Sequence, residues 1–345
     1  MHNGLLHMSR RMRYYIIKKM RKNIIAVLIL FSVILFALFS GNSAIGTGDI
    51  IKVIFGGGTE SQRLIVFDIR LPRIIAALFS GAALSVSGFI LQNNLNNTIA
   101  SPGLLGINNG AGLFVLISAL IFPYQAEVKC LMAFIGALTV TLLVSVLSNA
   151  TGMSKTSVIL SGVAVSAICV SIIDVIISLK PETVADKAAF QLGGFASVPF
   201  GSVKLDVPVI VITLIVSLLF APAMDIMALG DETAFGLGLN IRLNRGILLL
   251  AASLLTGAAV SMCGLIGFVG LLIPNFVRLF YKGKARGGIV FCVLIGAVFL
   301  LLCDTLSRIL VFPYELPCGL LLSVLGAPFL IRLLIKKRKR LGLFD

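Results

Sequence analysis

Hydrophobic residues along this chain fall into long runs, which polar positions or Gly- and Pro-containing breaks separate. A helix needs about 20 mostly apolar residues to cross a bilayer. Ten runs approach that length, and they predict ten spanning helices. The third and eighth runs are short, so we expect those helices to be tilted, broken or shielded by neighbours. The expected bounds are 24–41, 71–93, 105–122, 130–148, 157–179, 205–224, 246–265, 268–281, 287–303 and 316–335.

Composition supports a membrane protein. The 345 residues are 58% hydrophobic and 12% charged, whereas a soluble domain carries about 25% charged residues. A surface this apolar needs the lipid bilayer as its solvent, which predicts an all-α, polytopic fold. The first run follows a basic segment, as in a signal peptide, but it exceeds the usual apolar length of about 7–15 residues. Many further runs follow it, so we interpret it as an uncleaved span.

The positive charge sets the orientation. The formal net charge is +15. Lys and Arg gather in the tails at 1–23 and 336–345 and in the predicted loops on the same side, which hold about twice as many as the opposite loops. The positive-inside rule therefore places both termini in the cytoplasm. Binding to nucleic acid needs a basic face on a soluble fold, and the apolar runs leave no room for one.

Part of the sequence is repeated. Residues 80–90 match residues 256–266 at six of eleven positions, and Arg70-Leu-Pro-Arg73 and Arg242-Leu-Asn-Arg245 precede the two copies. The copies fall in the second and seventh predicted spans, an odd offset of five, so two inverted-topology halves are expected within one domain at 24–335, at about 24–200 and 201–335. Inverted halves are typical of transporters, with a pathway between them. Chance similarity between helices rich in small residues is the alternative.

Small residues also recur at close spacing, where they let helix backbones approach each other. Packing is the plainer interpretation of these glycines, and lining of a pathway is the more specific one. None fits a dinucleotide-binding fingerprint, because the strand–turn–helix context is missing. The candidates are Gly81, Gly88, Gly106, Gly110, Gly264, Gly267 and Gly270.

Several kinds of chemistry are excluded by what the sequence lacks. Both histidines, His2 and His7, lie in the N-terminal tail, and the six cysteines form no Cys-x-x-Cys pair. We therefore expect no metal site and no cofactor. The chain has no P-loop motif for ATP and no recognisable catalytic set. If ATP drives the protein, a separate subunit hydrolyses it.

Charged residues inside apolar runs are candidates for function. Asp174 lies in the fifth run, where an unpaired charge at mid-membrane costs about 2.5–3.5 kcal/mol. We expect it near the outer end or in a watery cavity, and it is the residue that a proton-coupled transporter would use. Asp304 and Arg308 are spaced to pair on one helix face, although contact with a partner is equally compatible.

Two arginines stand at a predicted outer helix start. Arg70 and Arg73 flank Pro72. Positive charge there opposes the helix dipole and the positive-inside rule, which suggests an acidic partner outside. Extension of the side chains to lipid headgroups is the alternative.

The longest predicted inner loop, 225–245, contains a short amphipathic segment. Asp231 is a plausible N-cap for a helix through Phe235, which Gly236 and Gly238 would end. Such a helix should dock onto another protein, or else lie on the headgroups.

Ordered motifs over residues 45–335 resemble the permease subunits of ABC importers for iron–siderophore, haem and cobalamin uptake. The resemblance is carried by Arg70–Arg73, Ser80–Gly88, Leu105–Ala111, Leu229–Ala234, Gly267–Pro274, Asp304–Arg308, Glu315–Gly319 and Gly326–Pro328.

The resemblance implies partners and roles. It implies a bacterial cytoplasmic membrane, a second permease subunit expected to be an identical copy, two ATP-binding subunits and an extracytoplasmic substrate-binding protein. Arg70, Arg73 and Arg308 would face acidic residues of the binding protein. The segment formed by Leu229, Gly230, Asp231, Glu232, Thr233 and Ala234 would be the coupling helix that docks into the ATPase. The expected cargo is an iron(III)–siderophore or related chelate, with haem or cobalamin as the alternative.

Three departures from the family pattern stand out. Asn97-Thr-Ile-Ala-Ser-Pro102 replaces Asn-Pro-Leu-Ala-Asp-Pro, Gly264-Leu-Ile266 replaces Gly-Pro-Ile, and Pro274-Asn275 replaces Pro-His. The first puts the geometry of an inner turn in doubt, because Thr98 does not fix φ as proline would. Two rivals from other classes are a secondary transporter that uses Asp174 and an intramembrane enzyme, which the absence of a catalytic set disfavours.

Overall fold

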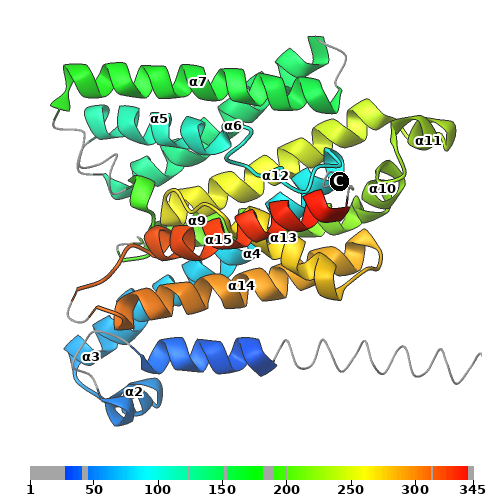
Figure 1. Ribbon diagram of the computed structural model, residues 1–345. Coiled ribbons are helices and arrows are strands. Elements are labelled where there is room, and N and C mark those ends of the chain that lie inside the picture. Colours follow the sequence, from blue (N-terminus) through cyan, green and yellow to red (C-terminus); the bar gives the residue numbers. More distant parts are fainter. Residues whose placement is uncertain are drawn as a thin grey trace, which may run out of the picture.

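The computed structural model describes residues 28–40, 46–122, 125–150, 154–181, 190–196, 198, 200–311 and 314–340. These residues form helices and connecting turns, without a strand among them (Figure 1). The helices are Leu28–Phe39, α2 (Thr47–Ile54), α3 (Glu60–Leu64), η1 (Ile65–Arg70), α4 (Leu71–Asn94), α5 (Ile107–Ile121), α6 (Ala126–Ala150), α7 (Lys155–Leu179), α9 (Phe200–Leu219), α10 (Ala221–Met227), α11 (Asp231–Gly236), α12 (Ile241–Cys263), α13 (Val269–Phe280), α14 (Ala285–Ile309) and α15 (Cys318–Arg340).

Each of the ten predicted runs coincides with one of these described helices, which confirms the all-α polytopic fold. Six helices are long and apolar enough to cross a membrane, and four shorter apolar helices accompany them within the described residues. The third and eighth runs are short as predicted, with 15 residues in α5 and 12 in α13. Residues 24–27 and 41 of the first predicted span lie outside the described residues.

Several boundaries differ from the prediction by a few residues, and two of the differences concern where a helix breaks or begins. The sixth run was expected to extend to residue 224, but α9 ends at Leu219 and α10 starts at Ala221 with Pro222 in its first turn. Proline is favourable in a first helical turn, where its missing N–H costs nothing. The second span was expected to start at residue 71, but the helix begins at Glu60 and passes through the π-helical turn η1 into α4 without interruption. The helix α2 was not predicted.

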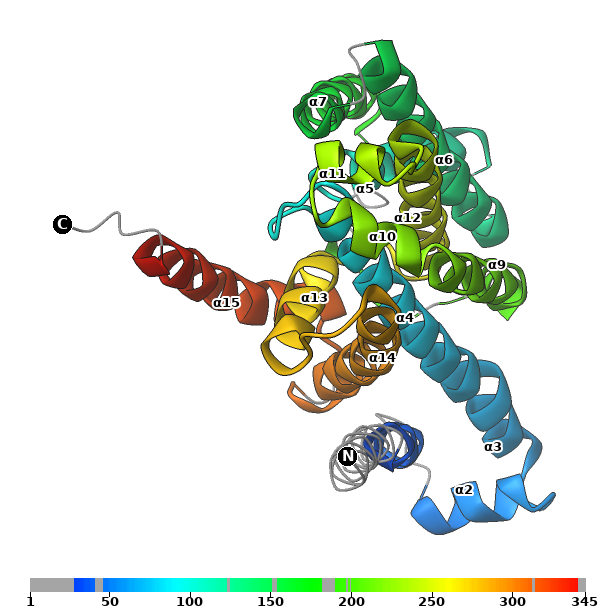
Figure 2. The same ribbon diagram turned by 90° about the vertical axis from the view of Figure 1, so that its right-hand side faces the viewer.

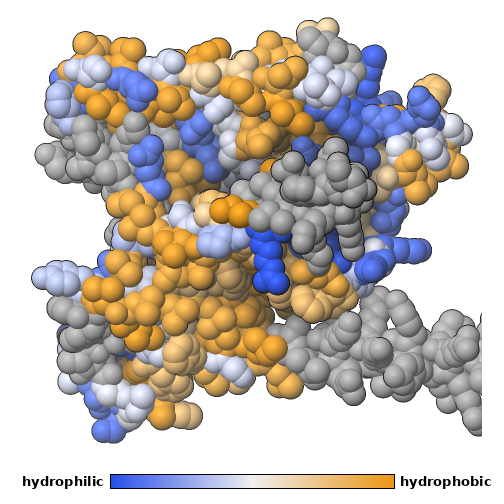
Figure 3. Space-filling model, in the orientation of Figure 1, coloured by the Kyte–Doolittle hydropathy of each residue, from blue (hydrophilic) through white to orange (hydrophobic). Residues whose placement is uncertain are grey.

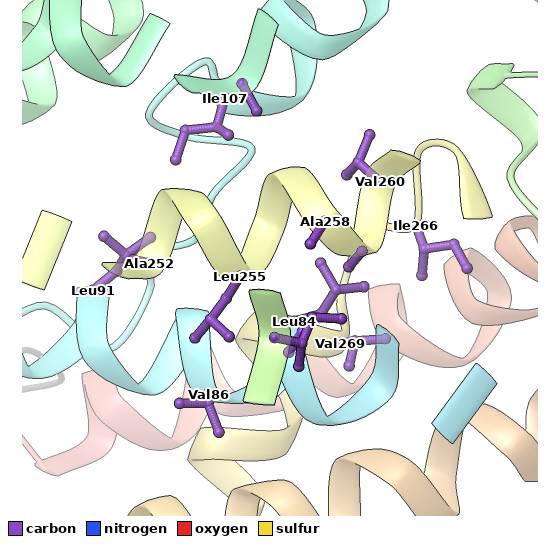
Figure 4. Packing of buried hydrophobic residues seen from close by; sticks show 14 of the residues in the cluster. Leu84, Val86, Leu91, Ile107, Ala252, Leu255, Ala258, Val260, Ile266 and Val269 are labelled. Atoms are coloured by element: carbon purple, nitrogen blue, oxygen red, sulfur yellow. The ribbon is translucent and has the colours of Figure 1, made fainter. Parts of the chain in front are cut away.

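The two copies of the repeat lie in α4 and α12, which pack against each other at the centre of the molecule (Figures 1 and 4). The Ser87 hydroxyl donates to the Ala252 carbonyl at 2.7 Å, and Asn94 Nδ2 donates to the Arg245 carbonyl at 3.2 Å. Later residues of α4 thus meet earlier residues of α12, so the helices run in opposite directions. That direction agrees with inverted halves.

Close packing at the centre depends on glycine. A Cβ atom at Gly88 would overlap the backbone of Gly270, and one at Gly81 would overlap the Gly296 carbonyl. Gly267 differs, because nothing lies within 4 Å of the place its Cβ would take. These close approaches between helix backbones are typical of helix packing in membranes. A role of the glycines in lining a pathway stays a prediction.

Much of the face shown in Figure 3 is apolar. Within an 18-residue apolar window, 83% of the residues are buried in the helix Glu60–Asn94, which contains α4, and 78% are buried in α12. In α7 only 22% are buried. Apolar patches this extensive mark contact with lipid or with another subunit. Asp174 lies on this exposed α7, five residues before its last residue.

Candidate functional site

Charged residues gather at both ends of the helix bundle. We call Arg70, Arg73, Asp304, Arg308 and Glu315 the outer cluster, using the predicted orientation. Arg70 ends η1, Arg73 lies in the first turn of α4, Asp304 and Arg308 lie in the last turns of α14, and Glu315 lies between α14 and α15. The start of α4, the end of α14 and the segment before α15 lie at the same end of the helix bundle, so these five side chains come together.

Arg73 joins both carboxylates of the outer cluster. Its Nε and Nη2 donate to Asp304 at 3.0 and 2.9 Å, and its Nη1 donates to Glu315 Oε2 at 2.8 Å. Asp304 also pairs with Arg308 at 3.5 Å, which confirms the pairing predicted from their spacing. A two-pronged contact between guanidinium and carboxylate is strong and directional, so this end of α4 is fixed to α14.

The other two arginines of the cluster bind the end of the first described helix. Arg70 Nη1 donates to the Leu38 carbonyl at 2.6 Å, and Arg308 Nη1 donates to the Ser40 carbonyl at 3.2 Å. The last carbonyls of a helix lack partners within it, and arginine side chains can satisfy them. The cluster therefore ties the helix Leu28–Phe39 to α4 and α14.

The predicted docking arginines are buried in this structure. Arg70, Arg73 and Arg308 are 4%, 7% and 4% exposed, although direct binding of an external acidic partner would favour open guanidinium groups. Burial is tolerated because carboxylates and carbonyls of this chain compensate the lost hydration. Their docking role stays a prediction. Glu315 differs from them, because 31% of its side chain is exposed.

At the opposite end, α11 forms the short helix that the sequence predicts, with one difference. Its N-cap is Gly230, not Asp231, and Gly230 has a φ of 112° that favours glycine. The N-cap expectation for Asp231 was wrong, because Asp231 is the first residue of the helix, and its side chain binds cations. The helix ends at Gly236, and Gly238 (φ 81°) follows the C-cap Leu237, so that Leu239 N donates to the Ala234 carbonyl at 3.0 Å in a Schellman arrangement.

We call Lys155, Asp231 and Arg245 the inner cluster. Both oxygens of Asp231 accept from Arg245 Nη2 at 3.0 Å, and Lys155 Nζ lies 3.2 Å from Oδ1. Burial raises the pKa of Asp231, but hydrogen bonds and attraction from Arg245 and then Lys155 outweigh it and hold the pKa below its usual range. Since Lys155 begins α7 and Arg245 lies near the start of α12, one carboxylate links α11 to two spans.

The surface around α11 is apolar and hollowed. Phe235 is 77% exposed, and Leu229 and Leu237 are exposed beside it, while Ala234 is buried. A groove of about 750 Å³ adjoins this face and is lined by Ser154, Asp231, Phe235, Gly238, Leu239, Asn240, Ile241, Arg242 and Arg245. An exposed aromatic side chain beside a groove is a typical anchor for a protein partner.

A further contact connects this region to α14. The side chain of Asp225, in α10, accepts from the Ala285 backbone at 2.7 Å and so satisfies a free N–H at the start of α14. This role of Asp225 could not be predicted from the sequence, because the two residues are 60 positions apart in the chain. The segment α10–α11 therefore touches α7, α12 and α14.

Two of the departures from the family pattern meet in space. Asn275 Nδ2 donates to the Thr98 carbonyl at 2.9 Å, and Asn97 Oδ1 accepts from Ile99 N at 3.1 Å in the same turn. A side-chain oxygen that accepts a backbone N–H two residues later stabilises such a turn without proline. The turn at 97–102 therefore has hydrogen bonds that compensate for Thr98.

Two further contacts of charged side chains were not predicted from the sequence. Asp206, in α9, binds the Ser261 hydroxyl of α12 in a buried pair. Arg278, in α13, binds Gln92 of α4 and lies 5.7 Å from the Phe89 ring. Asp206 could have been found, since it is an acidic residue inside a predicted span. Within the described part of the chain, no three His, Cys, Asp or Glu side chains form a group able to hold a metal ion.

A polytopic helical fold with two antiparallel repeat helices at its centre is typical of a membrane transport protein. A sequence model of the FecCD transport family matches residues 27–336. The chain belongs to this family.

Relatives agree with that assignment. The chain is 35% identical to the Fe(3+)-citrate import system permease protein YfmD of Bacillus subtilis (strain 168), over 86% of this chain and 89% of that protein. It is also 35% identical to the hemin transport system permease protein HmuU of Yersinia pestis, over 80% and 84%. A solved inward-facing ABC transporter of the metal-chelate type has the same fold, with a TM-score of 0.79 and 23% identity over 90% of this chain and 97% of that one.

Proposed function

We propose that this chain is the membrane-spanning permease subunit of an ATP-driven importer, and that it carries an iron(III)–siderophore or related chelate across the bacterial cytoplasmic membrane. The family match over residues 27–336 is the observation that carries the proposal. Relatives named for Fe(3+)-citrate and for ferric enterobactin support an iron chelate. Haem is the second candidate, because HmuU is as similar as YfmD.

The geometry supports an assignment of partners to the two ends. Each of the two ATP-binding subunits would bind the exposed face of α11 in one of the two permease copies, with Leu229–Ala234 as the coupling segment and Phe235 as an anchor. The ion pairs of Asp231 and the hydrogen bond of Asp225 would transmit movement of the ATP-binding subunits to α7, α12 and α14. The apolar, exposed face of α7 would pack against a second copy of the chain. An extracytoplasmic binding protein would dock at Arg70, Arg73 and Arg308, and both termini would lie in the cytoplasm.

Uptake by a deletion strain tests the proposed cargo. Cells that lack this chain would be given iron-55 as ferric citrate, ferric enterobactin, a ferric hydroxamate or hemin, beside the same cells complemented with the wild-type chain. The expected result is loss of ATP-dependent uptake of at least one compound and its recovery on complementation. Unchanged uptake of every compound would contradict the proposed class of cargo.

A further inference from the structure

The outer cluster contains one carboxylate that solvent can reach. Glu315 accepts from Arg73 at 2.8 Å, and 31% of its side chain is exposed, whereas the side chains of Arg73 and Asp304 are 9% and 1% exposed. Asp304 is enclosed and holds two arginines at once. Of these two carboxylates, only Glu315 can leave Arg73 without opening the helix bundle.

Glu315 lies where α15 begins. In Figure 2, α15 projects away from the other helices. Its first residues are held by Leu316 N, which donates to the Ser307 carbonyl at 3.1 Å, and by Gly319 N, which donates to the Gly193 carbonyl at 3.3 Å. Glu315 adds an ionic contact to these two backbone hydrogen bonds. Cys318, three residues further on and the first residue of α15, is 1% exposed.

The charges of the cluster favour exchange of one carboxylate for another. Three arginines face two carboxylates among these five residues, so the cluster keeps a positive excess. Removal of Glu315 alone would leave Arg73 with one carboxylate and would cost free energy. Replacement of Glu315 by another carboxylate restores the same number of charge-assisted contacts, so an acidic group from outside can compete.

We infer that Glu315 is a displaceable latch: an acidic side chain that arrives from outside takes its place on Arg73, and the released segment 314–317 frees the outer end of α15. The inference rests on the proposed docking at Arg70, Arg73 and Arg308, and it explains how a partner can bind arginines that are buried. The partner's chemistry is an exposed Asp or Glu on the docking face of the extracytoplasmic protein. Docking of the partner would in this way allow one membrane span, α15, to move.

Accessibility of Cys318 tests the latch. The full-length chain, in membranes with its partner subunits, would keep Cys318 as its one cysteine, the other five being replaced by alanine. Reaction with a membrane-impermeant maleimide from outside is expected to be slow with Glu315 present and about tenfold faster in Glu315→Gln, because the amide cannot hold Arg73 as a carboxylate does. Glu60→Gln neutralises an exposed carboxylate of α3 and should leave the rate unchanged.

A second arm tests the exchange itself. Hexaglutamate added outside should speed the labelling of Cys318 in the chain with Glu315 and add nothing in Glu315→Gln, while hexalysine should have no effect. Equal labelling with and without Glu315 would overturn the latch. Fast labelling in Glu315→Gln, together with no effect of hexaglutamate on the chain that keeps Glu315, would overturn the exchange and leave Glu315 as a fixed contact. Neither arm needs cargo or ATP, so failure here is separate from failure of the uptake experiment.

Discussion

Asp231 neutralises cations that belong to two different spans. Its carboxylate holds Arg245 of α12 and Lys155 of α7 from the first residue of α11. Arg245 near a helix start opposes the dipole of α12, and Asp231 compensates for that charge. The residue thus contributes to the position of α11 as well as to the stability of the inner ends of the spans.

Asp231→Asn should weaken this link. Hydrogen bonds to charged groups contribute about 1.5–3 kcal/mol, and the partial exposure of Asp231 favours the lower end, which is roughly tenfold in an equilibrium. We expect less transport per ATP hydrolysed in reconstituted membranes. The effect should be smaller when Arg245→Gln is already present, because both changes remove the same contact. Additive effects would contradict the role given to the pair.

The depressed pKa of Asp231 also predicts the pH dependence of the link. A carboxylate with a lowered pKa contributes stability above its unfolded pKa of about 3.9, and the contribution is lost as pH falls through the lower folded value. The ratio of transport to ATP hydrolysis should therefore not change between about pH 5 and pH 8 through this group.

At the scale of residues, contacts between neighbours in the sequence could be predicted, whereas contacts between residues far apart in the chain could not. The pairing of Asp304 with Arg308 follows from one helical turn. The contact of Arg73 with Asp304 joins residues 231 positions apart, and no local pattern reveals it. For the same reason, the sequence could not show that Arg70, Arg73 and Arg308 are buried. Asp231 was misassigned as an N-cap because spacing cannot show that Gly230 takes that position with a positive φ.

Helices of this molecule were predicted well where length and apolarity alone decide. All ten spanning runs correspond to described helices, because a bilayer demands long apolar segments. The break between α9 and α10 was missed, since Phe220 and Ala221 continue the apolar run while Pro222 starts a new helix. The helix α2 was missed because eight residues with a charged first turn resemble a loop.

The contact between α4 and α13 gives a prediction for one element pair. Gly88→Ala places a methyl group on the backbone of Gly270, and overpacking of this kind costs about 1–3 kcal/mol. The melting temperature of the purified protein in detergent should fall. Gly267→Ala is the matched control, because its Cβ meets nothing within 4 Å. A Gly88→Ala protein as stable as this control would contradict the packing described for α4.

At the scale of the whole molecule, the internal repeat predicted two inverted halves, and α4 and α12 run antiparallel as it requires. The sequence could not show which helices form the centre. By hydropathy α7 is more apolar than α12, yet α12 is mostly buried and α7 mostly exposed. Lipid and protein interior are both apolar, so hydrophobicity does not distinguish a helix that faces one from a helix that faces the other.

Every role proposed here depends on α11 and the outer cluster lying on opposite sides of the membrane. Figure 1 places α11 and α2 at opposite ends of the helices, and Phe235 and Phe55 are 77% and 86% exposed there. The most direct test labels Phe235→Cys and Phe55→Cys, each in a cysteine-free chain, with a membrane-impermeant maleimide on intact spheroplasts. The account predicts labelling at position 55 from outside, and at position 235 only after lysis. Labelling of position 235 on intact spheroplasts would contradict it.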